Sequence, residues 1–279
     1  MLTRPLLLAA ANRLKLAGCD TPRLDAELLL MFAWQVRRTD LITRSNDAVP
    51  ETVAETFESM LKRREAREPL AYITGEKEFW SRPFHVTPAV LIPRPETEHL
   101  IESVLEVFPD QQGFYHFCDI GTGSGCIGLT LACEYPHAQV TITDISQAAL
   151  LIATENAKNL GVTDRISFRC GDMLAALTTS DGPYDAIISN PPYVALHEMD
   201  GLESELSHEP GSALTDGKDG LSFLTVILNQ GLSHLKQHGF IMVETGPCGL
   251  PETPSGLHPD KDIYDLAGLL RGARYKRIQ

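Results

Sequence analysis

Apolar stretches of strand length alternate with helical patterns from about residue 96 to residue 244, and this alternation restricts the fold more than any other feature. Strands that are apolar along most of their length are buried on both faces, and the intervening helices cover a parallel sheet. The sequence therefore predicts an α/β, Rossmann-like fold with a mostly parallel sheet. The expected strands are 114–120, 140–144, 166–170, 184–189 and 240–244, and the expected helices begin near residue 96 and cover 126–135, 147–160 and 220–237.

The first 70 residues have only helical periodicity. Thr21 and Pro22 are typical of an N-cap and a first helical turn, and a later helix is expected from about Pro50 to Arg67. The two helices are expected to bury Leu24, Leu28, Met31 and Phe32, and Val53, Phe57, Met60 and Leu61, respectively. We interpret the basic cluster at the end of the later helix as a solvated helix end rather than a binding patch; it consists of Lys62, Arg63, Arg64 and Arg67.

Residues 71–95 have a different pattern, with apolar alternation on both sides of Ser81-Arg82-Pro83 that indicates a short hairpin. Arg94 stands between two prolines in an extended segment, from which it can reach an active site or pair with a surface acid. The sequence therefore predicts a helical domain over 1–75, a hairpin linker over 76–95 and an α/β domain over 96–279. Residues 195–219 are expected to form a long polar loop.

A glycine-rich segment follows the first expected strand and precedes a helix. It reads Asp119-Ile120-Gly121-Thr122-Gly123-Ser124-Gly125, and its glycines allow the backbone to approach a ligand closely. The third glycine comes one residue earlier than in the dinucleotide fingerprint, where Cys126 stands instead. The pattern D-x-G-x-G-x-G is that of S-adenosylmethionine methyltransferases, although NAD binding and a structural turn stay open. The candidate cofactor residues here are Gly121, Thr122, Gly123, Ser124 and Gly125.

Carboxylates follow the next two expected strands. Asp144 ends the second strand, where an acid can accept hydrogen bonds from both ribose hydroxyls of a nucleoside; its alternative role is a helix N-cap. Asp172 and Met173 follow the third strand, where Asp172 can accept from an adenine amine and Met173 can pack on the ring or simply in the core. These three residues complete the predicted cofactor site together with Asn190.

The segment Asn190-Pro191-Pro192-Tyr193 follows the fourth expected strand, at the edge where open α/β sheets hold their ligands. The two prolines stiffen the backbone, so the carbonyl groups of Asn190 and Pro191 have fixed directions beside a side-chain amide. This arrangement suits binding of a planar NH2 group. Its alternative interpretation is a proline-rich turn after a strand.

Net charge separates the two parts of the chain. The total is −13, but residues 1–70 carry 11 basic and 10 acidic residues, whereas the remainder carries 13 and 27. An acidic α/β part lacks the basic footprint of a nucleic-acid enzyme. The six cysteines and nine histidines have no metal spacing, so we predict no metal site, no membrane span and reduced thiols in a cytoplasmic protein.

Several segments together resemble the release factor glutamine N5-methyltransferases, the PrmC/HemK family. The matching segments are Glu68 to Gly75, Glu78-Phe79, Leu91-Ile92-Pro93-Arg94-Pro95-Glu96-Thr97-Glu98, Asp119 to Gly125, Asp144 and Asn190 to Tyr193. The segment from Leu91 to Glu98 is more specific than either later motif. The resemblance implies a class I S-adenosylmethionine-dependent methyltransferase domain, preceded by a small helical domain that docks the protein substrate and by a hairpin linker.

The resemblance also implies the reaction, in which a methyl group passes from S-adenosylmethionine to the amide nitrogen of the glutamine in the Gly-Gly-Gln motif of peptide chain release factors 1 and 2. Asn190 and Pro191 are then the catalytic pair, because Asn190 Oδ1 and the Pro191 carbonyl can each accept one amide N–H. The substrate-binding residues are Asn190, Pro191, Pro192 and Tyr193, with Tyr193 expected to pack on the substrate side chain.

The C-terminus departs from the family pattern. A Pro/Gly-rich stretch over 247–259 replaces a helix, and residues 262–279 indicate only weakly a last strand or hairpin, so the sequence leaves open whether the far edge of the sheet is complete. Two alternative functions stay open: an N-methyltransferase for another protein glutamine or for an exocyclic amine of nucleic acid, and a non-catalytic adaptor that binds the cofactor.

Overall fold

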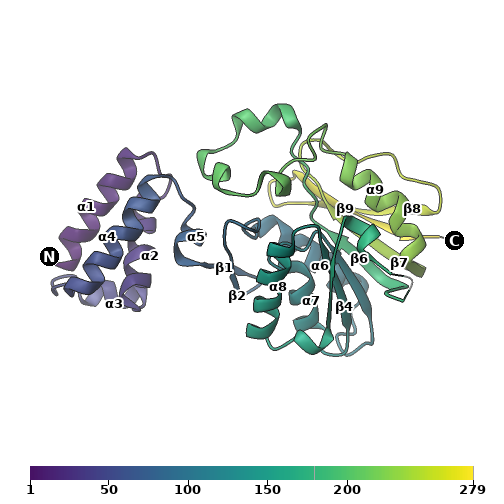
Figure 1. Cartoon of the computed structure of the whole chain (residues 1–279), viewed down its shortest axis with the longest axis horizontal. Coiled ribbons are helices and arrows are strands. Elements are labelled where there is room, and N and C mark those ends of the chain that lie inside the picture. Colours follow the sequence, from purple (N-terminus) through teal and green to yellow (C-terminus); the bar gives the residue numbers. More distant parts are fainter. Residues whose placement is uncertain (179, 279) are drawn as a thin grey trace. The chain divides into compact units, whose positions relative to one another are not determined.

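The computed structural model describes residues 1–178 and 180–278, which divide into two compact units. The first unit contains Met1–Glu76 together with Glu203–His208, and the second contains Lys77–Leu202 and the chain from Glu209 onward. Figure 1 labels their elements. Within the described part of the chain, no helix combines the length and the apolar character needed to cross a membrane.

Helices packed around one apolar core make up the first unit. They are α1 (Thr3–Leu16), α2 (Pro22–Trp34), α3 (Arg38–Thr43), α4 (Glu51–Glu65) and α5 (Leu70–Thr74). Helix α4 buries Phe57, Met60 and Leu61, as predicted. The predicted inner face of α2 was wrong for Leu24 and Phe32, which are exposed, whereas Met31 packs against the core. The buried residues of α2 are instead Asp25, Ala26, Leu29 and Leu30.

A buried ion pair accounts for the face that α2 turns inward. Its apolar run offers two helical stripes, but only one of them carries Asp25, which accepts a hydrogen bond from Arg64 Nε at 2.8 Å. Both side chains are 5% exposed. Arg64 also pairs with Glu205, so the interpretation of the basic cluster as solvated was wrong for Arg64, and its two carboxylate partners equally exclude a binding patch there.

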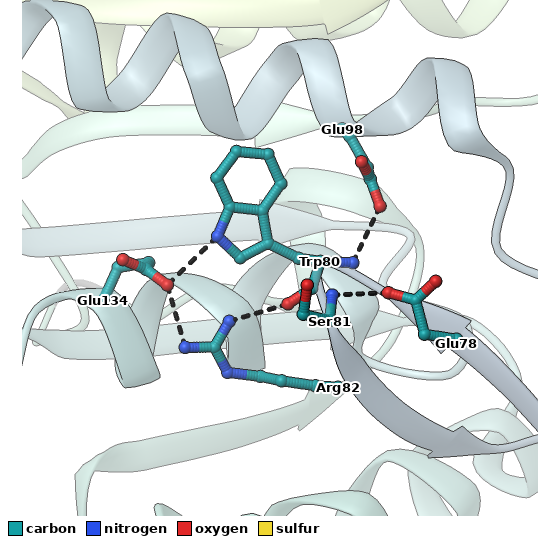
Figure 2. Close-up of a pocket in the computed structure, with 6 residues that line it drawn as sticks. All are labelled: Glu78, Trp80, Ser81, Arg82, Glu98 and Glu134. Atoms are coloured by element: carbon teal, nitrogen blue, oxygen red, sulfur yellow. Dashed lines mark hydrogen bonds and ion pairs between the residues drawn. The ribbon is translucent and has the colours of Figure 1, made fainter.

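The predicted hairpin is present, with strands β1 (Glu76–Phe79) and β2 (Arg82–His85). Its turn residues Trp80 and Ser81 have φ angles of 51° and 58° without being glycine. Figure 2 shows how carboxylates hold this turn: Glu98 accepts from the Trp80 backbone N–H at 2.7 Å, and Glu134 accepts from Trp80 Nε1 at 3.0 Å. A hollow of about 740 Å³ lies beside the turn, and the residues that line it make these hydrogen bonds. We therefore interpret these residues as structural, because they hold the hairpin in place.

A seven-stranded sheet forms the centre of the second unit, in the order β5-β4-β3-β6-β7-β9-β8. Strands β3 to β7 are parallel, and β9 runs antiparallel to β7 and β8. The strands are β3 (His116–Ile120), β4 (Gln139–Asp144), β5 (Ile166–Cys170), β6 (Tyr184–Ser189), β7 (Leu235–Glu244), β8 (Leu257–Tyr264) and β9 (Leu270–Arg277). The Rossmann-like, mostly parallel sheet predicted from the sequence is thus confirmed.

Helices cover both faces of this sheet. Helices α6 (Glu98–Val107), α7 (Cys126–Glu134) and α8 (Gln147–Asn159) share one apolar cluster with β3 and β4, and α9 (Ser222–Gly231) packs on the opposite side (Figure 1). Short 3-10 turns complete the unit; they are η1 (Pro95–Thr97), η2 (Thr163–Arg165), η3 (Met173–Ala176) and η7 (Leu232–His234). The order of the strands makes β3 and β6 the neighbours at which the chain changes direction, and ligands bind at this point in such sheets.

The structure corrects one expectation for the C-terminal third and decides a question that the sequence left open. The helix predicted over 220–237 ends at Gly231, because Leu235 already pairs with Tyr184 in the sheet. The far edge of the sheet is complete, because β8 and β9 extend it. Pro259 lies in β8, the edge strand, beside a register shift, and an edge position tolerates proline because its missing N–H is not needed there.

The segment 195–219 is more ordered than a plain polar loop. It contains the 3-10 turns η4 (Leu196–Gly201), η5 (Ser204–His208) and η6 (Gly211–Ala213). Val194, which precedes the segment, forms a parallel bridge with Thr215, near its end. The six cysteines are free thiols; Cys118 is buried as expected for a core strand, whereas Cys170 is exposed.

Candidate functional site

A cavity of about 440 Å³ lies at the carboxyl ends of β3, β4 and β6. Gly121, Asp144 and Asn190, which follow or end these three strands, all line it. Its lining also includes Leu91 and Pro210, which lie outside the strands of the sheet. The cavity therefore stands where the strand order of an open α/β sheet predicts a ligand.

The glycine loop contributes two residues to the cavity wall. Gly121 and Gly123 have φ angles of 70° and 55°, and a Cβ added at either would meet no heavy atom within 4 Å. Glycine is needed here for the left-handed backbone, and the open space on its surface lets a ligand approach the main chain. The Gly123 N–H donates to Asp144 Oδ2 at 2.9 Å, which fixes the loop to the end of β4.

The other three loop residues lie behind this wall. Thr122 donates from its hydroxyl to Asp119 Oδ2 at 2.6 Å, and the buried Ser124 accepts at its carbonyl from Asn156 Nδ2. Gly125 precedes α7, and a Cβ there would lie 2.6 Å from Leu129 Cδ1. Thr122, Ser124 and Gly125 thus shape the loop without lining the cavity.

Asp119 is the buried carboxylate beneath the loop. Its Oδ2 accepts from Thr122 and from the Gly128 N–H, whereas Oδ1 has no hydrogen-bond partner among the described residues. Burial raises the pKa of Asp119 to about 6, and the two hydrogen bonds oppose that rise. Asp119 therefore joins the end of β3 to the first turn of α7.

Asp144 holds two backbone segments at the cavity edge. Its Oδ1 accepts from the Ser146 N–H at 2.8 Å and its Oδ2 accepts from Gly123. Burial raises the pKa of this carboxyl above its ordinary value. The N-cap of α8 is Ser146, whose hydroxyl accepts from the Ala149 N–H at 3.2 Å, so the alternative role of Asp144 as the cap was wrong.

Asp172 and Met173 also line the cavity, after β5. Met173 has a φ of 48°, an uncommon backbone conformation for a residue with a side chain, and such conformations concentrate at ligand sites. Sequence reasoning missed Ile145, which lines the same cavity and is 67% exposed. The sequence could have indicated Ile145, because an apolar residue directly after the strand end at Asp144 lies outside the core.

The Asn190-Pro191-Pro192 segment forms another side of the cavity, directly after β6. Asn190 Nδ2 donates to Thr97 Oγ1 at 3.0 Å. Asn190 Oδ1 has no hydrogen-bond partner among the described residues, so an acceptor remains for a ligand. The site thus offers acceptors where a planar NH2 group can bind.

The Tyr193 side chain lies outside the cavity lining. Its hydroxyl donates to Glu244 Oε1 at 3.2 Å, and a Cβ on Gly246 would lie 2.7 Å from its ring. Burial beside this carboxylate raises the pKa of the Tyr193 hydroxyl. The sequence led us to expect that Tyr193 packs on the substrate side chain. In the structure, Tyr193 instead supports the Asn190-Pro191-Pro192 segment from outside the cavity.

Arg94 pairs with a buried acid rather than with a surface one. Arg94 Nη2 donates to Glu209 Oε1 at 2.5 Å, and the Ile92 N–H donates to Glu209 Oε2 at 3.1 Å. The Glu209 side chain is 2% exposed. This carboxylate ties the segment of Leu91 to the segment of Pro210, and both of these residues line the cavity.

These residues fit a nucleoside cofactor with an amino-acid tail. The open glycine backbone can approach the cofactor, Asp144 stands beside the loop as an acceptor for ribose hydroxyls, and Ile145 and Met173 offer apolar contact for a base. Among the described residues that line the cavity, the titratable groups are Asp144 and Asp172 only.

Comparisons with known proteins agree with this geometry. Residues 6–75 match the PrmC N-terminal domain family, and residues 100–243, just over half of the chain, match the methyltransferase small domain family. A release factor glutamine methyltransferase of Nitratidesulfovibrio vulgaris is 41% identical over 274 residues, covering 95% of this chain and 92% of the relative. One of Cereibacter sphaeroides is 42% identical and covers 94% of both chains.

Solved structures support the fold alone. The catalytic domain of hMettl16, solved in complex with the MAT2A 3′UTR hairpin 6, has a TM-score of 0.51 and 17% identity. The match covers 70% of this chain and 75% of that one.

Proposed function

The chain belongs to the release factor glutamine methyltransferase family, and from this membership and the cavity geometry we propose its reaction. It transfers a methyl group from S-adenosylmethionine to the side-chain amide nitrogen of the glutamine in the Gly-Gly-Gln motif of peptide chain release factors 1 and 2. The observation that carries this proposal is the free acceptor Asn190 Oδ1 at the cavity, after a strand of the sheet.

S-adenosylmethionine, when bound, supplies an electrophilic methyl group on a sulfonium sulfur. Residues of the chain that would hold it are Gly121, Gly123, Asp144, Asp172 and Met173. The glycines admit it to the backbone, Asp144 accepts hydrogen bonds from hydroxyl groups, and the residues after β5 hold its base. Thr122, Ser124 and Gly125 support this site by fixing the loop.

Asn190 and Pro191 orient the substrate nitrogen. An amide nitrogen is a weak nucleophile, because its lone pair is delocalised into the carbonyl. Asn190 Oδ1 and the Pro191 carbonyl each accept one N–H, so the lone pair is held in one direction and catalysis comes from positioning. The same two acceptors stabilise the positive charge that develops on nitrogen. Pro191 is buried and Pro192 lines the cavity, which keeps this backbone rigid.

The mechanism needs no strong base. Among the described cavity residues there is no histidine, lysine or cysteine. After transfer, the methylated nitrogen is strongly acidic and releases its extra proton readily, so a weak acceptor suffices. The proposed chemistry is therefore consistent with a cavity that presents oxygen acceptors and few titratable groups.

We also propose the domain division 1–75, 76–95 and 96–279, with the helical domain docking the release factor. Helices α1 to α5 and the hairpin strands fall within the first two ranges, which supports it. Six free thiols support a cytoplasmic location, where cysteines stay reduced. A nucleic-acid amine as substrate is less favoured, because the α/β part is strongly acidic.

The test is transfer of labelled methyl from S-adenosylmethionine to purified release factor, beside a Gly-Gly-Ala variant of the release factor and a DNA duplex. We expect label on the release factor alone. The enzyme variant Asn190→Ala should bind S-adenosylhomocysteine as the wild type does, yet lose at least about a hundredfold in kcat. Asn229→Ala, an exposed asparagine on α9, is the matched control. An active Asn190→Ala enzyme contradicts the role of Asn190, and label on DNA contradicts the substrate.

A further inference from the structure

A chain of hydrogen-bonding groups extends from Asn190 away from the cavity into the protein. Asn190 Nδ2 donates to Oγ1 of Thr97, the last residue of η1, which directly precedes α6 and is 1% exposed. The Thr97 hydroxyl also lies beside the Glu244 carboxylate, at the end of β7, and opposes the rise in the pKa of that carboxyl. The Tyr193 hydroxyl donates to the same carboxylate. None of these three supporting residues lines the cavity.

The orientation of the Asn190 amide decides whether the site can work. The two ends of a side-chain amide have nearly the same size, but one end accepts hydrogen bonds and the other donates them. If the NH2 end faced the cavity, it would meet the NH2 group of the substrate donor against donor. Something in the protein must therefore select the orientation that presents Oδ1.

We propose that Thr97 and Glu244 are positioning residues that fix the Asn190 amide with Oδ1 facing the substrate. This inference rests on the proposed function and deepens it. An ionised carboxylate can only accept, so the single hydroxyl proton of Thr97 points to Glu244. The Thr97 oxygen then has only lone pairs to offer Asn190, and Asn190 must present Nδ2 to it. Oδ1 is left for the cavity.

The burial of Glu244 strengthens this polarity. Glu244 is 2% exposed, and its Oε2 has no hydrogen-bond partner among the described residues. A buried carboxylate oxygen with too few donors is costly, so the Thr97 proton is more stable on the Glu244 side than on the Asn190 side. The 3.0 Å contact from Asn190 Nδ2 to Thr97 Oγ1 has the donor and acceptor in the order that this requires.

Protonation of Glu244 removes the constraint. A neutral carboxyl can donate to Thr97, Thr97 can then donate to Asn190 Oδ1, and the amide is free to turn. Burial raises the pKa of Glu244 to about 7, and the negative charge of Glu96 adds to the rise. The hydroxyls of Thr97 and Tyr193 and the positive charge of Arg271 oppose it. These groups, which come from η1, the Asn190 segment and β9, together set the pH at which the orientation is lost.

Paired substitutions at Thr97 provide the test. Thr97→Val keeps the shape and removes the hydroxyl, whereas Thr97→Ser keeps the hydroxyl. We expect Thr97→Val to lower kcat about ten- to hundredfold, with KM for the release factor and the Kd of S-adenosylhomocysteine within about twofold of wild type, and Thr97→Ser to retain most of kcat. Thr130→Val is the matched control, because Thr130 is equally buried in α7 and its hydroxyl has no partner among the described residues.

The pH profile separates positioning from a merely structural role. Wild-type kcat should rise as the pH increases through about 7, since Glu244 ionises there. Thr97→Val and Glu244→Gln should both lose this limb, because the link between ionisation and the Asn190 amide is broken. A Thr97→Val enzyme with wild-type kcat and pH profile overturns the inference, and so does a Thr97→Ser enzyme as impaired as Thr97→Val.

Failure of the inference is distinguishable from failure of the proposed function. If the wild type does not label the release factor, or if Asn190→Ala is active, the proposed function fails. If Asn190→Ala is inactive while Thr97→Val behaves as wild type, only the positioning role fails.

Discussion

Replacing Glu209 by glutamine tests whether one buried carboxylate holds the part of the cavity wall that contains Leu91 and Pro210. Glu209 Oε1 accepts from Arg94 and Oε2 accepts from the Ile92 N–H, so both partners are donors. Glutamine keeps one acceptor and places an NH2 group against the other donor. The change therefore removes one hydrogen bond to a charged group and leaves a buried donor unsatisfied.

The magnitude follows from these contacts. A hydrogen bond to a charged group contributes about 1.5–3 kcal/mol, and an unsatisfied buried donor costs about 1–3 kcal/mol. Arg94 is 29% exposed, so water recovers part of its loss, and we expect a net destabilisation of about 2–4 kcal/mol. In a domain of about 200 residues each kcal/mol lowers Tm by about 2–4 °C, so Tm should fall by about 5–15 °C.

Ligand binding gives the second readout. Leu91 precedes Ile92 and Pro210 follows Glu209, and both line the cavity, so a loosened wall must be ordered again when the cofactor binds. An ordering cost of about 1 kcal/mol corresponds to about a fivefold rise in the Kd of S-adenosylhomocysteine, measured by calorimetry. Glu198→Gln is the matched control in the same loop, because Glu198 accepts one hydrogen bond, from the Ala195 N–H. The reasoning is refuted if Glu209→Gln leaves Tm and Kd as Glu198→Gln does.

Three further substitutions test other parts of the structure. Burial raises the pKa of Asp119 to about 6 from an ordinary 3.8, so the folded state binds the proton more tightly than the unfolded state does, and the free energy of unfolding falls as the pH rises from about 4 to about 6. Asp119→Asn should remove that fall and raise the free energy of unfolding at pH 7 by up to about 3 kcal/mol. Denaturant titrations at pH 5 and pH 7 would measure both effects. Gly220→Ala should abolish most methyl transfer, because its Cβ would overlap the Tyr193 carbonyl. Asp25→Ala leaves Arg64 without its buried partner and should destabilise the helical unit by about 3–5 kcal/mol in a melt followed by circular dichroism.

Each of these has an outcome that contradicts it. An unchanged pH dependence of stability in Asp119→Asn means that the carboxyl is not buried in solution as it is here. Gly201→Ala is the control for Gly220→Ala, because a Cβ at Gly201 meets no atom within 4 Å, and equal activity of both would remove the steric argument. A melting curve unchanged by Asp25→Ala would mean that Glu205 alone neutralises Arg64.

The sequence predicted those parts of the site whose chemistry is local. The glycine loop, Asp144 and Asn190 could be predicted because each lies at or directly after the end of a strand. In the loop, the need for a left-handed backbone also indicated glycine, and for Asp144 and Asn190 the side chain itself indicated the role. The parallel strands were equally accessible, because apolar runs of strand length leave few alternatives.

What the sequence did not predict depends on partners far along the chain. Asn190 contacts Thr97 across 93 positions, and Arg94 contacts Glu209 across 115. Periodicity offers no information on such pairs, so Arg94 stayed ambiguous and Glu209 was missed. Glu244 did have a signal, because it ends an apolar strand as Asp144 does. The buried face of α2 was wrong for the same reason, since the partner that selects the face, Arg64, lies 39 positions away.

The acidity of the α/β part is partly a property of its site. Asp119, Asp144 and Glu244 stand at the carboxyl ends of β3, β4 and β7, and each is used as an acceptor for donors of the chain itself. Burial raises the pKa of all three, which means that their negative charge is held at a cost that those hydrogen bonds partly offset. A phosphate backbone brought to this edge would be repelled by Asp144 and Asp172, which line the cavity, whereas a glutamine side chain brings an NH2 group that needs acceptors. The arrangement that orients a glutamine amide is therefore also one that disfavours nucleic acid, although methyl transfer to an exocyclic amine of a base would use the same chemistry.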